Sequence, residues 1–415
     1  MKRHLIGIGG VGMSALATAL LRLGDEVTGA DRTLGTSNIR FLESLGIRCF
    51  PDDGSGIDAA TDEVIVSTAI EETNAGLRKA KELGIPVTHR AKALARTLGG
   101  YKLVAVVGTC GKSTVTAMLG HVLAECGLDP MCVNGANVPG WEGAVRFGKG
   151  EYAVAEVDES DKSLVAFSPY AAIVTNASAD HYSKEEMDEV FDAFVKDCPG
   201  PVVDGRGGLE GLDGLEVPIP GKHNVDNAVL AIRMAVALGV KVADAVAAMK
   251  SFGGVERRLQ RIRPAFEHSN VRTFERSSPA IYDDYAHNPE KLQAMWTTLA
   301  EKFPGGVCVV WRPHGYGPLK KMLEPLAEMF NRTIRSQDKL LLLPVYDAGG
   351  TAMRDINSPA LAARIGPGKC KLVADLDAAY GWCAGHRADF GAFVTCGARD
   401  PGLPALARRL AESMV

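Results

Sequence analysis

The chain has 415 residues, 46% hydrophobic and 23% charged, and its 46 basic and 50 acidic side chains leave a net charge of −4. This composition is typical of a globular protein with two or three domains and excludes a mainly disordered, collagenous or coiled-coil chain. The charge balance argues against a protein that coats nucleic acid. The nine cysteines form no CxxC pair, which indicates a reducing compartment, such as the cytoplasm, and argues against a structural zinc site.

The N-terminal segment combines a basic start with an apolar run, as a signal peptide does. Its four glycines, and the arginine that follows the run, favour instead a strand over Leu5–Ile8, a glycine turn and a helix from about Gly12. Elsewhere no stretch of about 18 charge-free apolar residues predicts a membrane span.

Short apolar runs alternate with helical patterns over the rest of the chain, which predicts parallel sheets covered by helices on both faces. The predicted strands are HLIGI, EVTGA, EVIVST, KLVAVVG, YAVAEV, AAIVTN, VCVVW, KLLLLPV and FGAFVTC. The clearest helical patterns cover Ser14–Leu23, Thr114–Cys126, Val225–Ala237 and Pro289–Lys302. Glycine pairs at 99–100 and 253–254 predict boundaries between three domains, over residues 1–99, 100–255 and 256–415.

A first glycine loop, Gly7–Gly12, matches GxGxxG between a predicted strand and a predicted helix, and Asp31 ends the next predicted strand. The glycines allow a close backbone approach, and the helix N-terminus offers N–H groups to a diphosphate. The Asp31 carboxylate is placed to accept a hydrogen bond from a ribose hydroxyl or a base N–H. A glycine turn without a ligand is the alternative, and the motif does not distinguish NAD from a UDP-sugar.

A second glycine loop, Gly108–Thr114, has the sequence GTCGKST and also lies between a predicted strand and helix. Backbone N–H groups of such loops surround phosphates, while Lys112 would neutralise them and Ser113 would ligate Mg²⁺. Valine at position 106 departs from the usual P-loop spacing, so the shorter GTxGK[ST]T form describes the loop better. Two phosphate loops suit an enzyme that uses ATP on a nucleotide-carried substrate better than a dehydrogenase or a kinase-like ATPase.

Beyond these loops, the chain resembles the Mur ligases, ATP-dependent enzymes that add amino acids to UDP-N-acetylmuramic acid. The matching segments, in the family's order, are HLIGIGGVGMSALA, VSTAIEETN, THRAKAL, GTCGKST, AEVDESD, VTN…DH, GKHNVDNAVLAI, GVERRL, YDDYAHNPE and WRPHGY. The N-terminal half is most similar to the branch that adds the first amino acid, and the tripeptide-adding branch is a close second. The resemblance implies an α/β fold with a Rossmann-like N-terminal domain for the UDP-sugar, a central P-loop ATPase-like domain, and a mobile Rossmann-like C-terminal domain on the amino-acid side.

The resemblance also implies roles for individual residues. Those expected at the UDP-sugar are Gly9, Gly10, Gly12, Met13, Ser14, Asp31, Ser67, Ala69 and Ile70. Those expected at ATP are Gly108, Thr109, Gly111, Lys112, Ser113, Thr114, Asn224, Asn227, Arg257, Arg258 and Asp284. Those expected at Mg²⁺ are Ser113, Glu156 and His181, and the last two form the expected catalytic group together with Lys112. Those expected near the incoming amino acid are Tyr285, His287 and His314.

The implied reaction is amide-bond formation through an acyl phosphate, with ATP and Mg²⁺ as cofactors. The implied partners are a UDP-N-acetylmuramic acid-type substrate and an amino acid or peptide, and we expect a monomer or weak dimer that binds neither nucleic acid nor a membrane. Because water would hydrolyse an acyl phosphate, the C-terminal domain is expected to close, with a hinge near Gly253 and Gly254.

Several positions depart from the family's pattern. Cys110 stands where the alanine-adding branch typically has histidine, and Gly350 replaces the acid of a later AGE pattern. The family's PHRYxR segment has lost both arginines that are expected to hold carboxylates, at Gly315 and Pro318. The candidates to compensate for that loss are Arg312, Lys320 and Lys321.

These departures leave two alternative functions open. One is a catalytically altered Mur-like nucleotide-binding protein with a different acceptor or a regulatory role, and the other is an NAD-dependent oxidoreductase. Structural roles are also alternatives for single residues: a solvated acidic turn for Glu156 and its neighbours, and turn or core positions for the histidines.

Overall fold

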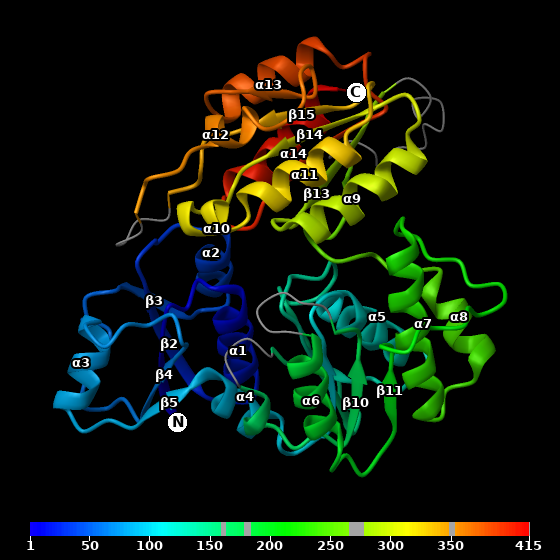
Figure 1. Ribbon diagram of the computed structural model, residues 1–415. Coiled ribbons are helices and arrows are strands. Elements are labelled where there is room, and N and C mark those ends of the chain that lie inside the picture. Colours follow the sequence, from blue (N-terminus) through cyan, green and yellow to red (C-terminus); the bar gives the residue numbers. More distant parts are fainter. Residues whose placement is uncertain (159–162, 178–183, 265–277, 348–352, 415) are drawn as a thin grey trace. The chain divides into compact units, whose positions relative to one another are not determined.

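The computed structural model of the chain describes residues 1–158, 163–177, 184–264, 278–347 and 353–414. The backbone divides into two compact units, one formed by Met1–Pro218 with His223–Val255 and the other by Ile219–Lys222 with Glu256–Val415. The first unit contains two sheets and the second contains one (Figure 1). The expected α/β class is confirmed, whereas the domain boundaries at residues 99/100 and 255/256 stay predictions.

The first sheet is parallel throughout, in the order β3-β2-β1-β4-β5. Its strands are β1 (Lys2–Ile6), β2 (Glu26–Asp31), β3 (Arg48–Pro51), β4 (Glu63–Val66) and β5 (Val87–His89). One face packs against α1 (Val11–Arg22), α2 (Ser37–Ser44) and α4 (Arg90–Leu98), and the other against α3 (Ala75–Glu82), as Figure 1 shows. Strand β1 ends two residues before the expected Ile8, because Gly7 turns the backbone into the left-handed region at φ +76°.

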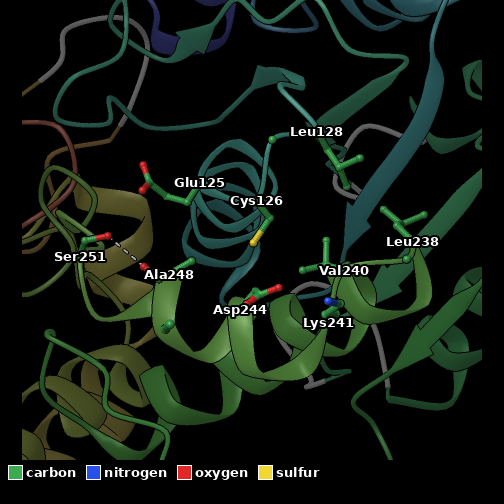
Figure 2. A pocket seen from close by; sticks show the side chains of 12 residues that line it. Glu125, Cys126, Leu128, Leu238, Val240, Lys241, Asp244, Ala248 and Ser251 are labelled. Carbon is green, nitrogen blue, oxygen red and sulfur yellow. Dashed lines mark hydrogen bonds between the residues drawn. The ribbon is translucent and has the colours of Figure 1, made fainter.

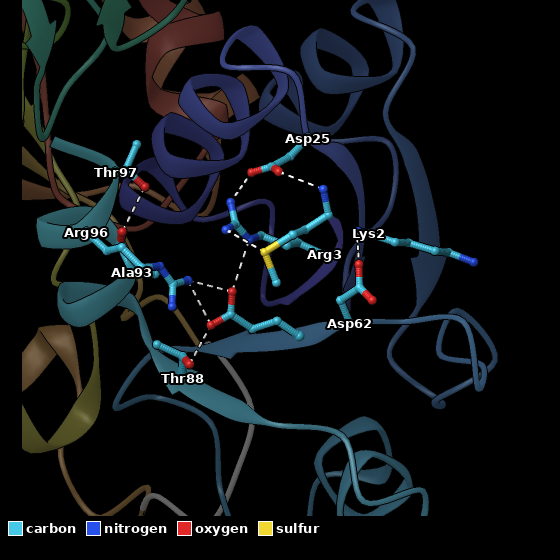
Figure 3. A network of polar contacts seen from close by, with 10 residues as sticks. Lys2, Arg3, Asp25, Asp62, Thr88, Ala93, Arg96 and Thr97 are labelled. Atoms are coloured by element: carbon cyan, nitrogen blue, oxygen red, sulfur yellow. Dashed lines mark hydrogen bonds and ion pairs between the residues drawn. The ribbon is translucent and has the colours of Figure 1, made fainter. Parts of the chain in front are cut away.

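A buried ion network ties the amino ends of these strands together (Figure 3). Glu63, whose side chain is 4% exposed, accepts hydrogen bonds from Arg3 at 3.0 Å, from Arg96 at 2.6 Å and from the Thr88 hydroxyl at 2.6 Å. Arg3 also pairs with Asp25. Burial would raise the pKa of Glu63, but these hydrogen bonds and cations hold that pKa below its ordinary value.

The second sheet has the order β11-β10-β6-β9-β7-β8 and is parallel except for the β7–β8 pair. Its strands are β6 (Lys102–Val107), β7 (Met131–Val133), β8 (Val145–Arg146), β9 (Tyr152–Glu156), β10 (Ala171–Val174) and β11 (Val202–Asp204). Its helices are α5 (Lys112–Glu125), the short 3₁₀ helix Ser163–Ala166, α6 (Lys184–Val195), α7 (Lys222–Ala237) and α8 (Val242–Met249). The first two sheets belong to one unit because they share a hydrophobic core. In addition, the Arg22 guanidinium donates two hydrogen bonds to the Glu142 carboxylate, at 2.7 and 2.8 Å.

The third sheet has the order β12-β13-β17-β14-β15-β16, with only the edge pair β12–β13 antiparallel. Its strands are β12 (Gln260–Ile262), β13 (Ala280–Asp284), β14 (Val307–Trp311), β15 (Lys339–Leu342), β16 (Cys370–Leu372) and β17 (Ala392–Cys396). Successive side chains alternate between two cores. Helices α9 (Pro289–Lys302), α10 (Tyr316–Lys321), α11 (Leu323–Thr333) and α12 (Ser358–Ala362) pack on one face, and α13 (Leu376–Gly385) and α14 (Gly402–Ser413) on the other.

The cysteines and the apolar helices bear on two expectations about the whole chain. All nine cysteines are free thiols, in agreement with the lack of a CxxC pair. In the part of the chain that the structure describes, no helix combines the length and apolar character that a bilayer crossing needs.

Candidate functional site

The first glycine loop connects β1 to α1 as a tight turn. The N–H groups of Gly7 and Ile8 both donate to the carbonyl of Ala30 on β2, at 2.8 and 3.1 Å. Gly10 caps α1, and no side chain bonds to the backbone there. The first-turn N–H groups of α1 therefore point outward from the turn without a side-chain cap, as an anion site requires.

Asp31, the acid predicted to face a ribose or base, fixes the shape of this turn. One carboxylate oxygen accepts the N–H of Gly9 at 2.9 Å, and the other accepts the N–H of Thr33 at 3.0 Å. A Cβ atom at Gly9 would lie 2.9 Å from the same carboxylate, so only glycine fits this approach. Asp31 thus positions the loop as well as bordering the expected substrate site.

Three further side chains lie against the glycine loop. The amide of Asn38 donates to the carbonyl of Gly9 at 2.8 Å, and the Ile70 side chain lies 3.4 Å from a Cβ built on Gly7. A Cβ built on Gly12 would lie 3.2 Å from a guanidinium nitrogen of Arg90. Arg90 brings a cation to the loop and was not among the predicted site residues, although its segment THRAKAL was noted.

The other residues predicted at the UDP-sugar differ in whether their side chains or only their backbone groups are available to a ligand. The Met13 side chain is buried in the core, and the Ser14 hydroxyl donates to the carbonyl of Val11 at 3.0 Å. These two residues therefore offer backbone rather than side-chain groups. Ser67 and Ile70 close a turn by a 3.1 Å backbone bond, with Ala69 exposed between them.

The second glycine loop leads from β6 into α5. Gly108 and Gly111 adopt φ values of +132° and +85°, which other residues rarely do. A Cβ at Gly108 would lie 2.1 Å from the Thr175 hydroxyl, so the neighbouring strand leaves no room for a side chain. The hydroxyls of Ser113 and Thr114 are buried in the first turn of α5.

Asn176, which follows β10, holds this loop and was not predicted as a site residue. Its Oδ1 accepts the Thr109 hydroxyl at 2.7 Å and the Cys110 N–H at 2.9 Å, and its Nδ2 donates to the Cys110 carbonyl at 3.0 Å. The Thr175 hydroxyl donates to the same carbonyl at 2.6 Å. The loop is therefore preorganised from the adjacent strand.

Lys112 is the first residue of α5, and its side chain folds back over the second glycine loop. Its ammonium donates to the carbonyl of Gly108 at 2.6 Å and lies 3.8 Å from the carboxylate of Asp158. The side chain is 12% exposed, so the charge stays close to the loop backbone. A phosphate bound by the loop would find this cation already in place.

The predicted magnesium ligands can be tested in part. Oε2 of Glu156 accepts the N–H of Gly135 at 2.9 Å, and a Cβ at Gly135 would lie 2.4 Å from that oxygen. Among the described residues, no partner of Oε1 is present, and no trio of His, Cys, Asp and Glu side chains could hold a metal alone. A hydroxyl and one carboxylate suit Mg²⁺, which usually completes its octahedron with phosphate and water oxygens. His181 lies outside the described residues.

The two asparagines predicted at the adenine side lie in the first turns of α7. Both are buried, and Oδ1 of Asn227 would lie 2.6 Å from a Cβ at Gly111. Asn227 therefore packs against the phosphate loop, while Asn224 lies one turn before it on the same helix. The structure thus brings Asn227 to the loop, and the adenine-side role of both asparagines stays a prediction.

The residues predicted to reach the nucleotide from the second unit form a buried network. Arg257, at φ +59°, donates to Asp283 at 3.0 Å and to the carbonyls of Gly397 and Ala398. Asp284 accepts the N–H groups of Leu259 and Ala286, both at 2.7 Å. These contacts hold the loop after Val255 on β13 and so give Arg257 and Asp284 a structural role.

Arg258 and its neighbour Arg257 both lie over the ring of Tyr285, with their guanidinium carbons 5.4 and 5.2 Å from the centroid. The Tyr285 ring packs edge-on against His287, with the centroids 5.4 Å apart, and His287 packs against His314 at 4.9 Å. His287 Nδ1 lies 2.9 Å from the carbonyl of Tyr285. The three residues predicted near the incoming amino acid are therefore brought together.

Both histidines have a depressed pKa. Burial lowers the pKa of His287 to about 4, with a further contribution from Lys291. Burial, Arg399 and Lys291 lower the pKa of His314 to about 4 as well. Both rings are therefore neutral at pH 7, and each offers one N–H donor and one acceptor nitrogen.

Two of the cations expected to compensate for the lost arginines are already paired. Arg312 bonds the buried carboxylate of Asp400 at 2.5 Å, and Lys320 pairs with Asp355. Neither is thus placed to hold a substrate carboxylate without breaking an ion pair.

A cavity of about 740 Å³ lies at the C-terminal end of α5, whereas the phosphate loop lies at its N-terminal end. Figure 2 shows the side chains that line this cavity. It is lined by the end of α5 and by α8, including Glu125, Cys126, Lys241 and Asp244. A helix of 14 residues spans about 21 Å. The cavity therefore lies apart from the second glycine loop, and no residue of either loop lines it.

The sequence is similar to known ligases over most of its length. A model described as "Mur ligase family, catalytic domain" matches residues 2–102. The UDP-N-acetylmuramate–L-alanine ligases of Rhizobium etli and Nitrosomonas eutropha are each 31% identical to this chain, over 422 and 419 residues. The matches cover 88% and 87% of this chain and 86% of each relative.

Solved structures share the fold. The UDP-N-acetylmuramate–alanine ligase of Thermotoga maritima has a TM-score of 0.83 at 24% identity, covering 99% of this chain and 98% of that one. A murein peptide ligase of Psychrobacter arcticus has a TM-score of 0.66 at 18% identity, covering 100% and 99%. A folylpolyglutamate synthase/dihydrofolate synthase of Yersinia pestis, complexed with AMPPNP and Mn, has a TM-score of 0.55 at 14% identity, covering 77% and 92%.

Proposed function

The chain belongs to the Mur ligase family, and on that premise we propose that it joins an amino acid or peptide to UDP-N-acetylmuramic acid at the expense of ATP. The observation that carries the proposal is the pair of preorganised glycine loops in one compact unit, before α1 and before α5. One loop would take the diphosphate of the carrier and the other the ATP phosphates. The curated relatives named above support the carrier, and the Yersinia complex supports a nucleotide with a divalent metal.

The proposed reaction has two steps. A carboxylate oxygen of the sugar attacks the γ-phosphorus of ATP, and the bond to the ADP oxygen breaks. The amine of the acceptor then attacks the acyl carbon and loses a proton. The bond between the acyl carbon and the bridging oxygen breaks, and inorganic phosphate leaves with that oxygen. Both substrates of the first step are anionic, so the protein must offset their repulsion.

The residues of the second loop supply that offset. The N–H groups of Gly108–Ser113 would surround the phosphates, and Lys112 would exchange the Gly108 carbonyl for phosphate oxygens. Ser113 and Glu156 would hold Mg²⁺, which spreads the charge of the transferring phosphoryl group when it is bound. His181 is proposed as a further metal contact by its place in the sequence.

Release of ADP tests the proposal. Purified protein with ATP, Mg²⁺, UDP-N-acetylmuramic acid and a panel of amino acids and peptides should release ADP over many turnovers only when sugar and acceptor are both present, because without an acceptor the acyl phosphate is not consumed. Lys112→Ala should abolish the release, whereas Arg408→Ala, at an exposed position on α14, should leave it unchanged. Failure of every acceptor, together with failure of hydroxylamine to trap an acyl phosphate, would overturn the proposal.

A second candidate is a Mur-like protein that binds nucleotides with an altered reaction. Gly315 and Pro318 in place of carboxylate-holding arginines, and the pairing of Arg312 with Asp400, favour it. It predicts an ATP-induced rise in melting temperature without trapped acyl phosphate. Trapping of the acyl phosphate from the sugar carboxylate would exclude it.

A further inference from the structure

Three neighbouring strands of the third sheet end in one register. Asp284 of β13 and Trp311 of β14 both pair with Cys396 of β17, which runs between them. All three strands are parallel, so their carboxyl ends meet at the same edge of the sheet. In open α/β sheets this edge is where ligands bind.

The residue three positions beyond each of these paired positions carries a polar ring or a cation. They are His287 after β13, His314 after β14 and Arg399 after β17. The shared register places all three at one edge, with Arg399 following the central strand. The 4.9 Å distance between the two imidazole centroids shows that the two outer segments do converge.

Hydrogen bonds fix these segments to one another. The Cys396 thiol donates to the carbonyl of Ala286 at 3.1 Å, and the N–H of Arg312 donates to the carbonyl of Cys396 at 3.2 Å. Asp400 is buried, and it binds both Arg312 and the N–H of Gly402. Arg399 is therefore an exposed side chain between buried and anchored neighbours, so its backbone is fixed while its guanidinium faces outward.

The charge at this edge comes from cations rather than from the histidines. Burial lowers the pKa of His287 and His314 to about 4 and keeps both rings neutral at pH 7; Lys291 contributes to both shifts and Arg399 to that of His314. The buried carboxylates of these segments are all engaged: Asp283 by Arg257, Asp284 by backbone N–H groups, and Asp400 by Arg312 and the N–H of Gly402. Lys291 and Arg399 therefore bring positive charge beside imidazole N–H donors.

We propose that Arg399 binds the carboxylate of the incoming amino acid or peptide, beside the His287–His314 pair. The proposal rests on the proposed ligase function, and it assigns to β17 a contact that the PHRYxR arginines would otherwise supply. A guanidinium holds a carboxylate by two parallel hydrogen bonds, which gives direction as well as charge. Arg312 is paired with Asp400 and Arg257 with Asp283, whereas Arg399 has the exposure that a substrate contact needs.

The experiment compares an acceptor with its own amide. Steady-state ADP release is measured with the best acceptor of the panel as the free acid and as the carboxamide, which keeps the amine but has no carboxylate. Arg399→Ala should raise KM for the acid about 10- to 100-fold, the range of a charge-assisted contact, and should change KM for the amide less than twofold. For the free acid, the KM of Arg399→Lys should lie between those of the wild type and Arg399→Ala. Arg408→Ala, on the surface of α14, should have the KM of the wild type.

The outcomes separate this inference from the function on which it rests. An unchanged KM for the acid, or an equal loss for acid and amide, overturns the role of Arg399 while the ligase remains. Hydroxylamine trapping of the acyl phosphate without any acceptor monitors the first step, which Arg399→Ala should leave unchanged. Absence of trapped product from the wild type removes the ligase function, and the proposed contact with it.

Discussion

The side-chain amide of Asn176 holds Cys110 by both of its backbone groups. Its Oδ1 accepts the N–H of Cys110 at 2.9 Å, and its Nδ2 donates to the carbonyl of the same residue at 3.0 Å. The middle of the phosphate loop is thereby fixed to the end of β10 before any nucleotide arrives.

Replacement of Asn176 by alanine should weaken nucleotide binding. The variant loses three hydrogen bonds to the loop, including that of the Thr109 hydroxyl, and at about 1 kcal/mol each this predicts a loss of ATP affinity of at least tenfold. Isothermal calorimetry with a non-hydrolysable ATP analogue measures it. Asn331→Ala, which removes comparable bonds in the second unit, is the control, and equal affinity of both variants would contradict the positioning role.

Gly111→Ala should damage the same loop for a different reason. The residue has φ +85°, and its new Cβ would lie 2.6 Å from Oδ1 of Asn227. Strain of about 1–3 kcal/mol predicts a loss of ATP affinity of about 5- to 150-fold. Gly100→Ala, where a Cβ meets nothing within 4 Å, is the matched control and should bind ATP like the wild type.

Glu63→Ala should destabilise the first unit strongly. The change leaves the buried Arg3 with one partner fewer, and breaking a buried ion pair costs about 3–5 kcal/mol. Urea unfolding at pH 7 measures the loss. Glu72→Ala removes an exposed partner of Lys81 and should change the free energy of unfolding by less than about 1 kcal/mol. Equal losses in the two variants would contradict the larger contribution of the buried Glu63 pair.

The same carboxylate gives a pH dependence. Since its folded pKa lies below the unfolded value of 4.5, Glu63 contributes stability above pH 4.5, and this contribution is lost as the pH falls through the folded pKa. Below pH 4.5, the urea concentration at the unfolding midpoint should therefore fall more steeply with pH in the wild type than in Glu63→Gln. If the midpoints of both proteins fall in parallel, Glu63 does not cause this loss of stability.

His4 should make the protein sensitive to mild acid. Its Nδ1 lies 2.9 Å from the Thr28 hydroxyl, and its buried Nε2 has no hydrogen-bond partner among the residues that the structure describes. Burial lowers its pKa to about 4 against the effects of Asp52 and Asp58. Because the unfolded chain takes up this proton from pH 6.5 downward, stability is lost between pH 6.5 and 4, by about 3 kcal/mol for the full interval. Urea titrations between pH 7 and 5 measure this pH-dependent loss of stability, which should disappear in His4→Gln, although that variant is itself less stable. If the free energy of unfolding of His4→Gln falls with pH as steeply as that of the wild type, His4 is not the cause of the loss.

Helix α9 shows how much of the fold the sequence could predict. Its predicted bounds, Pro289–Lys302, agree with the structure because Asn288 caps the helix and proline occupies its first turn. Strand β13 was not predicted, because AIYDD ends in two acids that are typical of a turn. Both acids are buried only because Arg257, Thr395 and backbone N–H groups engage them, and these partners come from distant parts of the chain.

The candidate site shows the same division. The glycine loops could be located from spacing alone, since their chemistry depends on consecutive residues. Asn176, Asn38 and Arg90 act through contacts that only the folded sheets create. Asn176 and Arg90 lie in the VTN and THRAKAL segments, but the segments alone do not reveal these contacts. Arg399 is similar, because its proximity to His314 depends on the register of β14 and β17.

The equal offsets of His287, His314 and Arg399 from their strands have a practical consequence. All three positions lie beyond the last ladder pairs that the sheet uses, so exchanging their side chains removes no interstrand bond. A combinatorial library at these three codons should accordingly yield many soluble members that differ in preferred acceptor, which makes this rim a starting point for engineering new peptide linkages.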